Sequence, residues 1–276
     1  MKIAVTGGSG RIGRAVVEMA AAQGHEVVSI DRVTPPPGAP LPGVTFKSLD
    51  VTDYPGFERV LRGCDALVHL AAIPAPFHDP DHVVHNNNVV GSYNALRAAA
   101  EAGIQRVCQA SSVNATGMSF SRKATFEYFP LDEQHPTYNE DPYSLSKWIC
   151  EQQGDSFARR YEEMKIASLR FHWVVPSRAD ARRPGGGNPD GLAKQVWAYT
   201  RLDRTASSCL LALTADFHGH EVFYIVAPDT MMDEPSMELK QRFYPNVPLR
   251  GELSGHRSFF DCSKAERVLG WTHPAG

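Results

Sequence analysis

The stretch that decides the fold is TGGSGRIG, residues 6–13, in which Gly7, Gly10 and Gly13 recur at every third position. It follows a short apolar run, Ile3-Ala4-Val5, and precedes a helical pattern. Glycine allows a backbone turn to approach a diphosphate, whose charge then faces the N-terminus of the helix. The spacing therefore predicts a dinucleotide cradle, although a tight turn in an unrelated α/β protein would leave a similar pattern.

Acidic residues end the next two apolar runs. Asp31 follows the second run, 18 residues after Gly13, where a carboxylate accepts hydrogen bonds from both hydroxyls of an adenosine ribose. That carboxylate repels a 2′-phosphate, which favours NAD over NADP, while Arg11 and Arg32 partly offset the repulsion. Asp50-Val51 ends the third run and is expected beside the adenine.

Strand and helix patterns alternate through the first two thirds of the chain. The expected strands are residues 3–5, 27–30, 44–49, 66–70, 106–110 and 165–171. The expected helices are residues 11–23, 54–62, 81–102 and 143–164. This alternation predicts right-handed crossovers and an α/β fold with a doubly wound parallel sheet of the Rossmann type.

The pattern changes after Phe171, where the segments become short. We expect residues 1–175 to form the dinucleotide-binding domain that carries the catalytic residues. Residues 176–276 are expected to form a small C-terminal substrate-binding lobe interleaved with the sheet edge, where open α/β sheets bind ligands. The connection at residues 178–191 contains Gly185-Gly186-Gly187, which we interpret as the hinge of a lid.

Composition excludes several classes of function. The 276 residues are 42% hydrophobic and 21% charged, with a net charge of −3, so no basic field for nucleic acid or an anionic membrane is expected. No apolar run approaches the roughly 20 residues of a transmembrane helix. Met1 leads directly into the first strand, which leaves no room for a signal peptide.

Cysteine and histidine spacing shows no ligand motif. The five cysteines are odd in number and scattered, without a CxxC or Cys/His pattern, which favours a reducing, cytoplasmic location. His78, His82 and His85 lie close together, but the sequence supplies no clear third ligand, so we expect no metal.

The run YSLSK places Tyr143 and Lys147 four residues apart at the start of a helix, and hence on one face. A nearby ammonium stabilises phenolate, so we expect Lys147 to lower the pKa of Tyr143 towards neutrality. A solvated Tyr/Lys pair would show the same spacing. However, Ser111-Ser112 directly follows the strand at 106–110, whose C-terminal end is expected beside the cofactor. Ser112 is therefore expected to hydrogen-bond the reacting oxygen.

Taken in order, these motifs resemble the extended branch of the short-chain dehydrogenase/reductase superfamily, the epimerases, dehydratases and sugar dehydrogenases. The resemblance spans nearly the whole chain. The matching motifs are TGGSGRIG, Asp31, LDVTD (49–53), HLAA (69–72), NNVVGSYNALRAA (87–99), QASSVNATG (109–117), DPYSLSK (141–147) and LGW (269–271).

The resemblance implies bound NAD, with Tyr143 as general acid/base, Lys147 on the nicotinamide ribose and Ser112 orienting the substrate oxygen. It also implies a homodimer through a four-helix bundle built from the helices at 81–102 and 143–164. The cofactor-binding residues it suggests are Gly7, Gly10, Arg11, Ile12, Gly13, Asp31, Asp50, Val51, Leu70, Ala71, Ala72, Asn88, Tyr143, Lys147 and Phe171.

Two departures from the patterns of these enzymes narrow the class of substrate. Nucleotide-sugar epimerases usually carry an asparagine shortly after the sixth strand and run longer than this chain; here LRFHWVVPS places Trp173 at the asparagine position. The acidic pair of the dehydratases is missing from SSVNATG. The chain looks more like the uronate dehydrogenases, which oxidise the anomeric carbon of a free sugar acid.

Basic and aromatic residues are candidates for binding such a substrate. Arg178, Arg182 or Arg183 could pair with a substrate carboxylate, or could equally belong to a solvated basic loop. Phe171, Trp173 and Met118 are expected to line the substrate pocket.

The prediction is an NAD-dependent oxidoreductase that acts on a hydroxyl or carbonyl of a small polar substrate, a sugar or sugar acid. A sugar epimerase that retains NAD is the alternative within enzymes. A protein of another class, an NAD-sensing regulator or a non-redox biosynthetic protein, could use the same fold. Such a regulator needs no proton-transfer residues, so Ser112, Tyr143 and Lys147 favour the enzyme.

Overall fold

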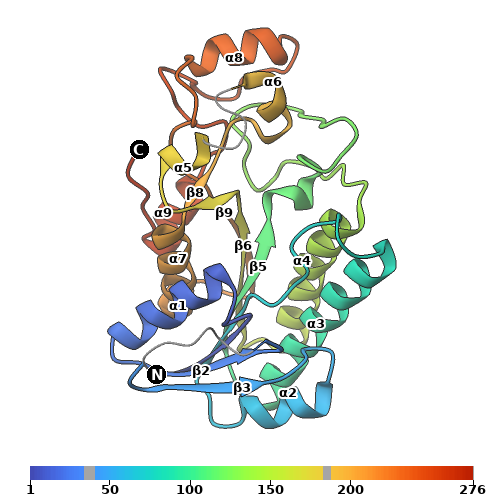
Figure 1. The fold of residues 1–276 in the computed structure, drawn as a ribbon, viewed down its shortest axis with the longest axis vertical. Helices are drawn as coiled ribbons and strands as arrows, with labels where there is room; N and C mark the ends of the chain where they lie inside the picture. Colours follow the sequence, from blue (N-terminus) through green and yellow to red (C-terminus); the bar gives the residue numbers. More distant parts are fainter. Residues whose placement is uncertain (34–40, 183–187, 276) are drawn as a thin grey trace.

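One parallel sheet of seven strands organises the chain (Figure 1). The computed structural model describes residues 1–33, 41–182 and 188–275. The strand order is β3-β2-β1-β4-β5-β6-β9, with every neighbouring pair parallel. The strands are β1 (Lys2–Thr6), β2 (Glu26–Asp31), β3 (Val44–Ser48), β4 (Ala66–His69), β5 (Arg106–Ser112), β6 (Lys165–Phe171) and β9 (His220–Ile225). The order reverses between β1 and β4, which confirms the predicted doubly wound Rossmann-type sheet.

Helices cover both faces of the sheet. On one face α1 (Arg11–Ala22) packs with α7 (Leu202–Thr214) and α9 (Ser263–Leu269), on the left in Figure 1. On the other face lie α2 (Tyr54–Leu61), α3 (Asp81–Glu101) and α4 (Pro142–Arg160). Each face buries its own apolar cluster against the strands, so the carboxyl ends of the strands form one rigid edge.

Two secondary-structure elements near the site, β5 and α4, have boundaries that differ from those expected from the sequence. Strand β5 continues through Ser111 and Ser112, which therefore end the strand instead of following it. Helix α4 begins at Pro142, because the Asp141 carboxylate caps the helix by accepting a hydrogen bond from the Ser144 N–H at 2.9 Å. The helix ends at Arg160, earlier than expected, because Tyr161 adopts φ −124° and ψ 82°, outside the helical region.

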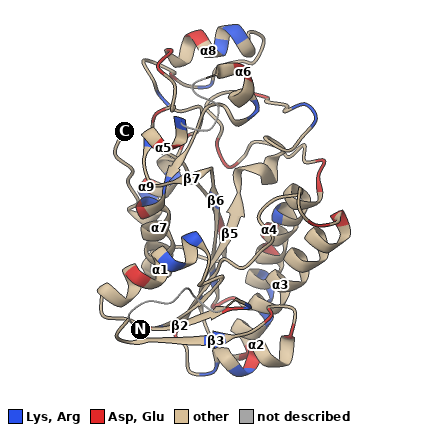
Figure 2. Ribbon diagram, viewed as in Figure 1, with Lys and Arg blue, Asp and Glu red and all other residues tan. Residues whose placement is uncertain are grey.

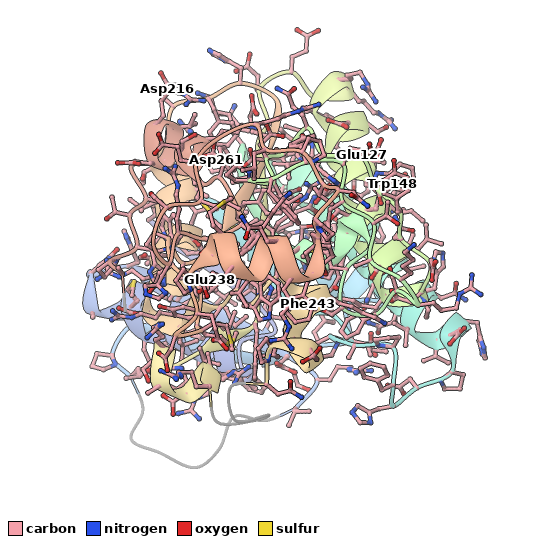
Figure 3. All side chains as sticks on the ribbon, turned by 90° about the horizontal axis from the view of Figure 1, so that it is seen from above. Glu127, Trp148, Asp216, Glu238, Phe243 and Asp261 are labelled. Atoms are coloured by element: carbon pink, nitrogen blue, oxygen red, sulfur yellow. The ribbon has the colours of Figure 1, made fainter. Side chains whose placement is uncertain are left out.

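A second layer of short elements sits above the carboxyl edge of the sheet, at the top of Figure 1. Seen from above, α8 lies across this layer, with Glu238 and Phe243 along it (Figure 3). Trp197 and Phe259 are completely buried in its core. The short elements are β7 (Val174–Val175), α5 (Arg178–Arg182), α6 (Pro189–Leu192), β8 (Thr200–Arg201), α8 (Ser236–Phe243) and the 3₁₀ turns η1 (Val113–Thr116) and η2 (Ala193–Gln195).

The chain crosses between the two layers more than once. Phe129, from the segment between β5 and α4, packs in the core of the upper layer. After residue 175 the chain returns to the sheet with α7 and β9, and again with α9. A division into two domains at residue 175 therefore stays a prediction. Gly185-Gly186-Gly187, expected to form a hinge, lies outside the described residues.

Charges of both signs are spread over the ribbon (Figure 2), in keeping with the net charge of −3. In the part of the chain that the structure describes, no helix combines the length and the apolar character needed to cross a membrane.

Candidate active site

The glycine turn between β1 and α1 is shaped so that only glycine fits at two of its positions. A Cβ added at Gly13 would lie 2.0 Å from the Gly7 carbonyl oxygen, and one added at Gly7 would lie 2.9 Å from the Ala71 nitrogen. Gly7 also has a positive φ of 69°. Helix α1 then starts at Arg11, and its N-cap, Gly10, makes no side-chain capping bond. The exposed start of α1 suits a diphosphate group, which its N–H groups and dipole attract.

A cavity of about 340 Å³ opens at this turn. Asp31, at the end of β2, lies at its edge, where its carboxylate accepts hydrogen bonds from the N–H groups of Ser9 at 3.0 Å and Val33 at 3.1 Å. The predicted cofactor residues that line the cavity are Gly7, Gly10, Arg11, Ile12, Gly13, Asp31, Val51, Leu70, Ala71 and Ala72. Their arrangement fits a dinucleotide, with the turn at the diphosphate and Asp31 at a ribose.

Two predicted cofactor residues, Asp50 and Asn88, lie outside the lining of this cavity. The Asp50 carboxylate accepts hydrogen bonds from the backbone and hydroxyl of Thr52 and pairs with Arg32 at 3.5 Å, outside the cavity lining. Buried Asn88 bonds both backbone groups of Ile73 and donates to the Ser146 hydroxyl at 3.0 Å. Asn88 thus fixes the loop after β4 against α4. Its neighbour Asn87 lines the cavity instead, which the sequence did not indicate.

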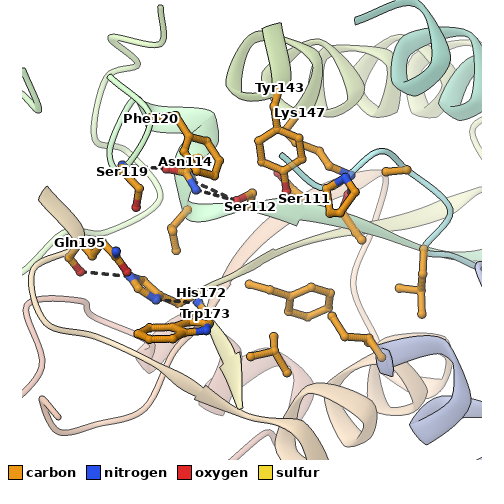
Figure 4. Close-up of a pocket in the computed structure, with 18 of the residues that line it drawn as sticks. Ser111, Ser112, Asn114, Ser119, Phe120, Tyr143, Lys147, His172, Trp173 and Gln195 are labelled. Atoms are coloured by element: carbon orange, nitrogen blue, oxygen red, sulfur yellow. Dashed lines mark hydrogen bonds between the residues drawn. The ribbon is translucent and has the colours of Figure 1, made fainter. Parts of the chain in front are cut away.

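A second cavity, of about 480 Å³, adjoins the first. Ser112, Tyr143 and Lys147 all line it (Figure 4). Phe171 lines it as well. The residues that line both cavities are Arg11, Ile12, Leu70, Ala72, Pro74 and Ala110. The three predicted catalytic side chains therefore meet where the dinucleotide cavity leads into a second space.

Burial governs the protonation of Tyr143, which is 8% exposed. Desolvation raises its pKa to about 12, and a hydrogen bond with Ser112 acts in the opposite direction. The expectation that Lys147 would lower this pKa towards neutrality is corrected. The Lys147 ammonium lies 5.9 Å from the centre of the tyrosine ring, and burial raises the pKa of Tyr143 instead. Ser112 is the group in the described structure that favours the phenolate.

Lys147 is buried, and its Nζ donates a hydrogen bond to the Ala110 carbonyl at 2.8 Å. Burial lowers the pKa of this lysine. Because Ala110 is in β5 and lines both cavities, the bond fixes the ammonium at their junction. That position suits a hydroxyl-bearing part of a bound dinucleotide.

A buried ion pair holds α4 against the sheet beneath these residues. Glu151, one turn beyond Lys147, binds the Arg170 guanidinium through two bonds of 2.8 Å and accepts from the Ser111 hydroxyl at 2.5 Å. Burial disfavours the charge of Arg170, but the Glu151 carboxylate still raises the pKa of Arg170 above its ordinary value. The guanidinium therefore stays charged, and the ion pair fixes the position of Tyr143 and Lys147 relative to β5.

The far end of the larger cavity is formed by residues that the sequence largely did not reveal. Trp173 and Phe171 line it as predicted, whereas Met118 is fully buried in the core of the upper layer. The additional lining residues are Val113, Asn114, Ser119, Phe120, His172, Val174, Leu192 and Gln195. Of these, Asn114 lies in the SSVNATG motif, which is the one signal that could have pointed to it.

Two of the three arginines proposed for a substrate carboxylate have partners outside the cavity. Arg178 donates to the carbonyls of Thr230 and Met232 and lies 3.4 Å from an Asp229 oxygen. Arg182 pairs with Asp233. Neither lines the cavity, and Arg183 lies outside the described residues. Within the described ranges, no group of three or more His, Cys, Asp or Glu is placed to hold a metal ion.

Comparison with known proteins places this geometry in a family. The model of the NAD dependent epimerase/dehydratase family matches residues 3–194. L-arabinose 1-dehydrogenase (NAD(P)(+)) of Haloferax volcanii is 32% identical over 203 residues, which cover 71% of this chain and 76% of that protein. dTDP-6-deoxy-L-talose 4-dehydrogenase (NAD(+)) of Aggregatibacter actinomycetemcomitans is 30% identical over 63% of this chain and 62% of its own length.

Solved structures share the fold over the whole chain. The UDP-glucose 4-epimerase of Thermotoga maritima superposes with a TM-score of 0.74 at 21% identity, covering 100% of this chain and 94% of that one. A mutated uronate dehydrogenase gives a TM-score of 0.71 at 20% identity, covering 99% and 82%. The family match confirms the predicted superfamily and the expectation of an NAD-dependent enzyme. The chain belongs to the NAD dependent epimerase/dehydratase family.

Proposed function

We propose that this protein is an NAD-dependent dehydrogenase that oxidises a hydroxyl of a small sugar, with the anomeric hydroxyl as the favoured position. The observation that carries the proposal is that Ser112, Tyr143 and Lys147 together line the larger cavity, which shares part of its lining with the dinucleotide cavity. The similarity to an L-arabinose 1-dehydrogenase over 76% of that protein supports a free sugar oxidised at the anomeric carbon.

The residues suggest a division of roles. Bound NAD supplies the ring carbon that accepts a hydride. Tyr143 takes the proton of the substrate hydroxyl as general base, and Ser112 hydrogen-bonds the same oxygen and the Tyr143 phenol. Lys147 holds the ribose next to the reacting ring from its site at Ala110. Gly7, Gly10 and Gly13 receive the diphosphate at the start of α1, and Asp31 the adenosine ribose.

The experiment is a screen of aldoses, sugar acids and sugar nucleotides with NAD, in which NADH formation is followed by its absorbance. We expect net NADH with at least one free sugar. Interconversion of sugar isomers without net NADH would identify an epimerase instead, and this alternative is plausible because a relative 28% identical is described as a putative UDP-glucose 4-epimerase. Bound NAD with neither reaction would favour a sensor or non-redox role.

We further propose a cytoplasmic homodimer that pairs α3 and α4 of two copies. Val90 and Tyr93 of α3 are 43% and 47% exposed, and Leu145 of α4 is 36% exposed, which gives these helices an apolar outer surface. All five cysteines are free thiols, which supports a reducing compartment. Light scattering of the purified protein should give twice the chain mass of 30.4 kDa; a mass of 30.4 kDa at micromolar concentration would contradict the dimer.

A further inference from the structure

The far end of the larger cavity has a fixed aromatic wall. Trp173 follows β6 and lies across the cavity from Ser112 and Tyr143 (Figure 4). Its backbone N–H donates to Nδ1 of His172 at 2.6 Å, while Nε2 of His172 donates to the Gln195 carbonyl at 3.0 Å. Burial lowers the pKa of His172 to about 4, so the ring is neutral. This neutral histidine therefore ties the Trp173 backbone to the turn that carries Gln195, while the partly buried Trp173 side chain packs against the core of the upper layer.

A second polar side chain is oriented by its own hydrogen bonds. The Asn114 side-chain carbonyl oxygen accepts from the Ser119 N–H at 2.8 Å, which directs its amide nitrogen away from that bond. The same nitrogen lies 3.5 Å from the Ser112 hydroxyl oxygen, and Asn114 lines the cavity. An amide N–H is thereby placed next to the catalytic serine, where it can donate to a hydroxyl oxygen of a substrate.

The charges of the described lining are concentrated at the cofactor end. Arg11 lies at the start of α1 and lines both cavities, and Lys147 is bonded to Ala110 at their junction. Among the described residues of the far end, the polar side chains are neutral: Asn114, Ser119, His172 and Gln195. Arg178 and Arg182 are engaged with the upper layer, Lys194 donates its Nζ to the Ser121 carbonyl at 2.7 Å, and Arg183 lies outside the described residues.

An anion placed at this end would lose its hydration without gaining a partner of opposite charge among these residues. A neutral sugar brings no charge that must be desolvated. Its hydroxyls match the amide and hydroxyl groups, and its C–H face can pack on the Trp173 indole. The lining thus discriminates by charge at the part of a sugar most distant from the reacting carbon.

We propose that the substrate is an uncharged, hydroxyl-rich molecule of the size of a free monosaccharide, bound between Trp173 and Asn114, and not a sugar acid or a nucleotide sugar. This inference rests on the proposed function and narrows it. It replaces the sugar acid that the resemblance to uronate dehydrogenases suggested.

The test compares sugars of the same stereochemistry that differ in charge. NADH formation with galactose and glucose is measured against galacturonate and glucuronate, with UDP-glucose and UDP-galactose as a third group. We expect kcat/KM for the better neutral sugar to exceed that of its matched acid by at least tenfold. A preference for the acid or for the UDP-sugar overturns the inference while leaving the dehydrogenase intact.

Variants of the lining residues test which side chains discriminate between neutral and acidic sugars. Trp173→Ala should raise KM for the neutral sugar about tenfold with a smaller change in kcat, and Trp173→Phe should restore most of the affinity. Trp148→Ala, a partly exposed position on α4 outside the cavity, is the control. Gln195→Arg adds a cation to the far end and should shift the acid-to-neutral ratio towards the acid by tenfold or more. Unchanged KM in Trp173→Ala together with an unchanged ratio in Gln195→Arg would overturn the proposal.

A binding measurement separates failure of the inference from failure of the proposed function. Tryptophan fluorescence of the wild type and of Trp173→Phe is titrated with galactose and with galacturonate in the presence of NADH. A response of the wild type to galactose alone, lost in Trp173→Phe, supports the neutral ligand even where turnover is absent and the dehydrogenase proposal fails. A response to galacturonate alone contradicts the neutral ligand whatever the turnover.

Discussion

At the cofactor end of the site, the turn at residues 6–13 places its glycines, the start of α1 and the edge of β4 around one cavity. At the substrate end, the lining comes from three separated segments, 112–120, 171–174 and 192–195. The first end depends on backbone geometry that only glycine permits, and the second on side chains at the ends of unrelated loops. A backbone requirement restricts sequence to a recognisable spacing, whereas a side-chain lining leaves no spacing of its own.

The largest expected effect is at the junction of the two ends. Tyr143→Phe removes the proton acceptor but keeps the buried ring and its edge contact with Phe120 at 5.6 Å. Turnover should fall by about 10²–10⁴-fold, while NAD binding and the melting temperature stay close to those of the wild type. Steady-state NADH formation and calorimetric titration with NAD provide the two readouts. Wild-type turnover in this variant would remove Tyr143 from the mechanism.

A single added methyl group that collides with the backbone should be enough to disrupt the cofactor end of the site. In Gly13→Ala the new Cβ would lie within 2.0 Å of the Gly7 carbonyl oxygen, and backbone must move to accommodate it. We expect a loss of NAD affinity above tenfold and a destabilisation of roughly 1–3 kcal/mol in thermal unfolding without cofactor.

Gly10→Ala is the matched control for that collision. Its Cβ would come no closer than 3.2 Å to the same oxygen, so the unfolding temperature without cofactor should change much less. Equal melting of the two variants and the wild type would show that the turn is not as tightly packed as its geometry requires.

The smallest effect is expected in the pH dependence. Burial raises the pKa of Tyr143 to about 12 and the Ser112 hydrogen bond lowers it, so oxidation, which needs the phenolate, should become faster as pH rises below that pKa. In Ser112→Ala the pKa of Tyr143 should rise further, and the rising limb of log kcat/KM should move to higher pH. A limb that stays in place would show that Ser112 does not act on Tyr143.

Much of the cofactor end could be predicted from the sequence, because its backbone geometry requires a recognisable glycine spacing. Gly7, Gly13 and Asp31 are tied to a strand, a turn and a helix whose patterns are visible. The hydrogen bonds of Asp50 with Thr52 and of Asn88 with Ile73 could not be predicted, because adjacency in sequence does not show them.

The substrate end could be predicted only in fragments. Phe171 ends a visible strand pattern, and the resemblance placed Trp173 two residues later at the asparagine position of the epimerases. His172 and Gln195, by contrast, meet only through a fold contact between distant segments. The pKa of Tyr143 was predicted in the wrong direction. The four-residue spacing shows that Lys147 is near, but it does not show the burial that raises this pKa.

The most direct test of the account is hydride transfer itself. A neutral aldose that the screen shows to be oxidised, deuterated at its anomeric carbon, is incubated with NAD, and the nicotinamide product is analysed by mass spectrometry. We predict one deuterium in each NADH formed, with a slower rate than for the unlabelled sugar if hydride transfer limits turnover. NADH that carries no deuterium would contradict direct transfer from that carbon.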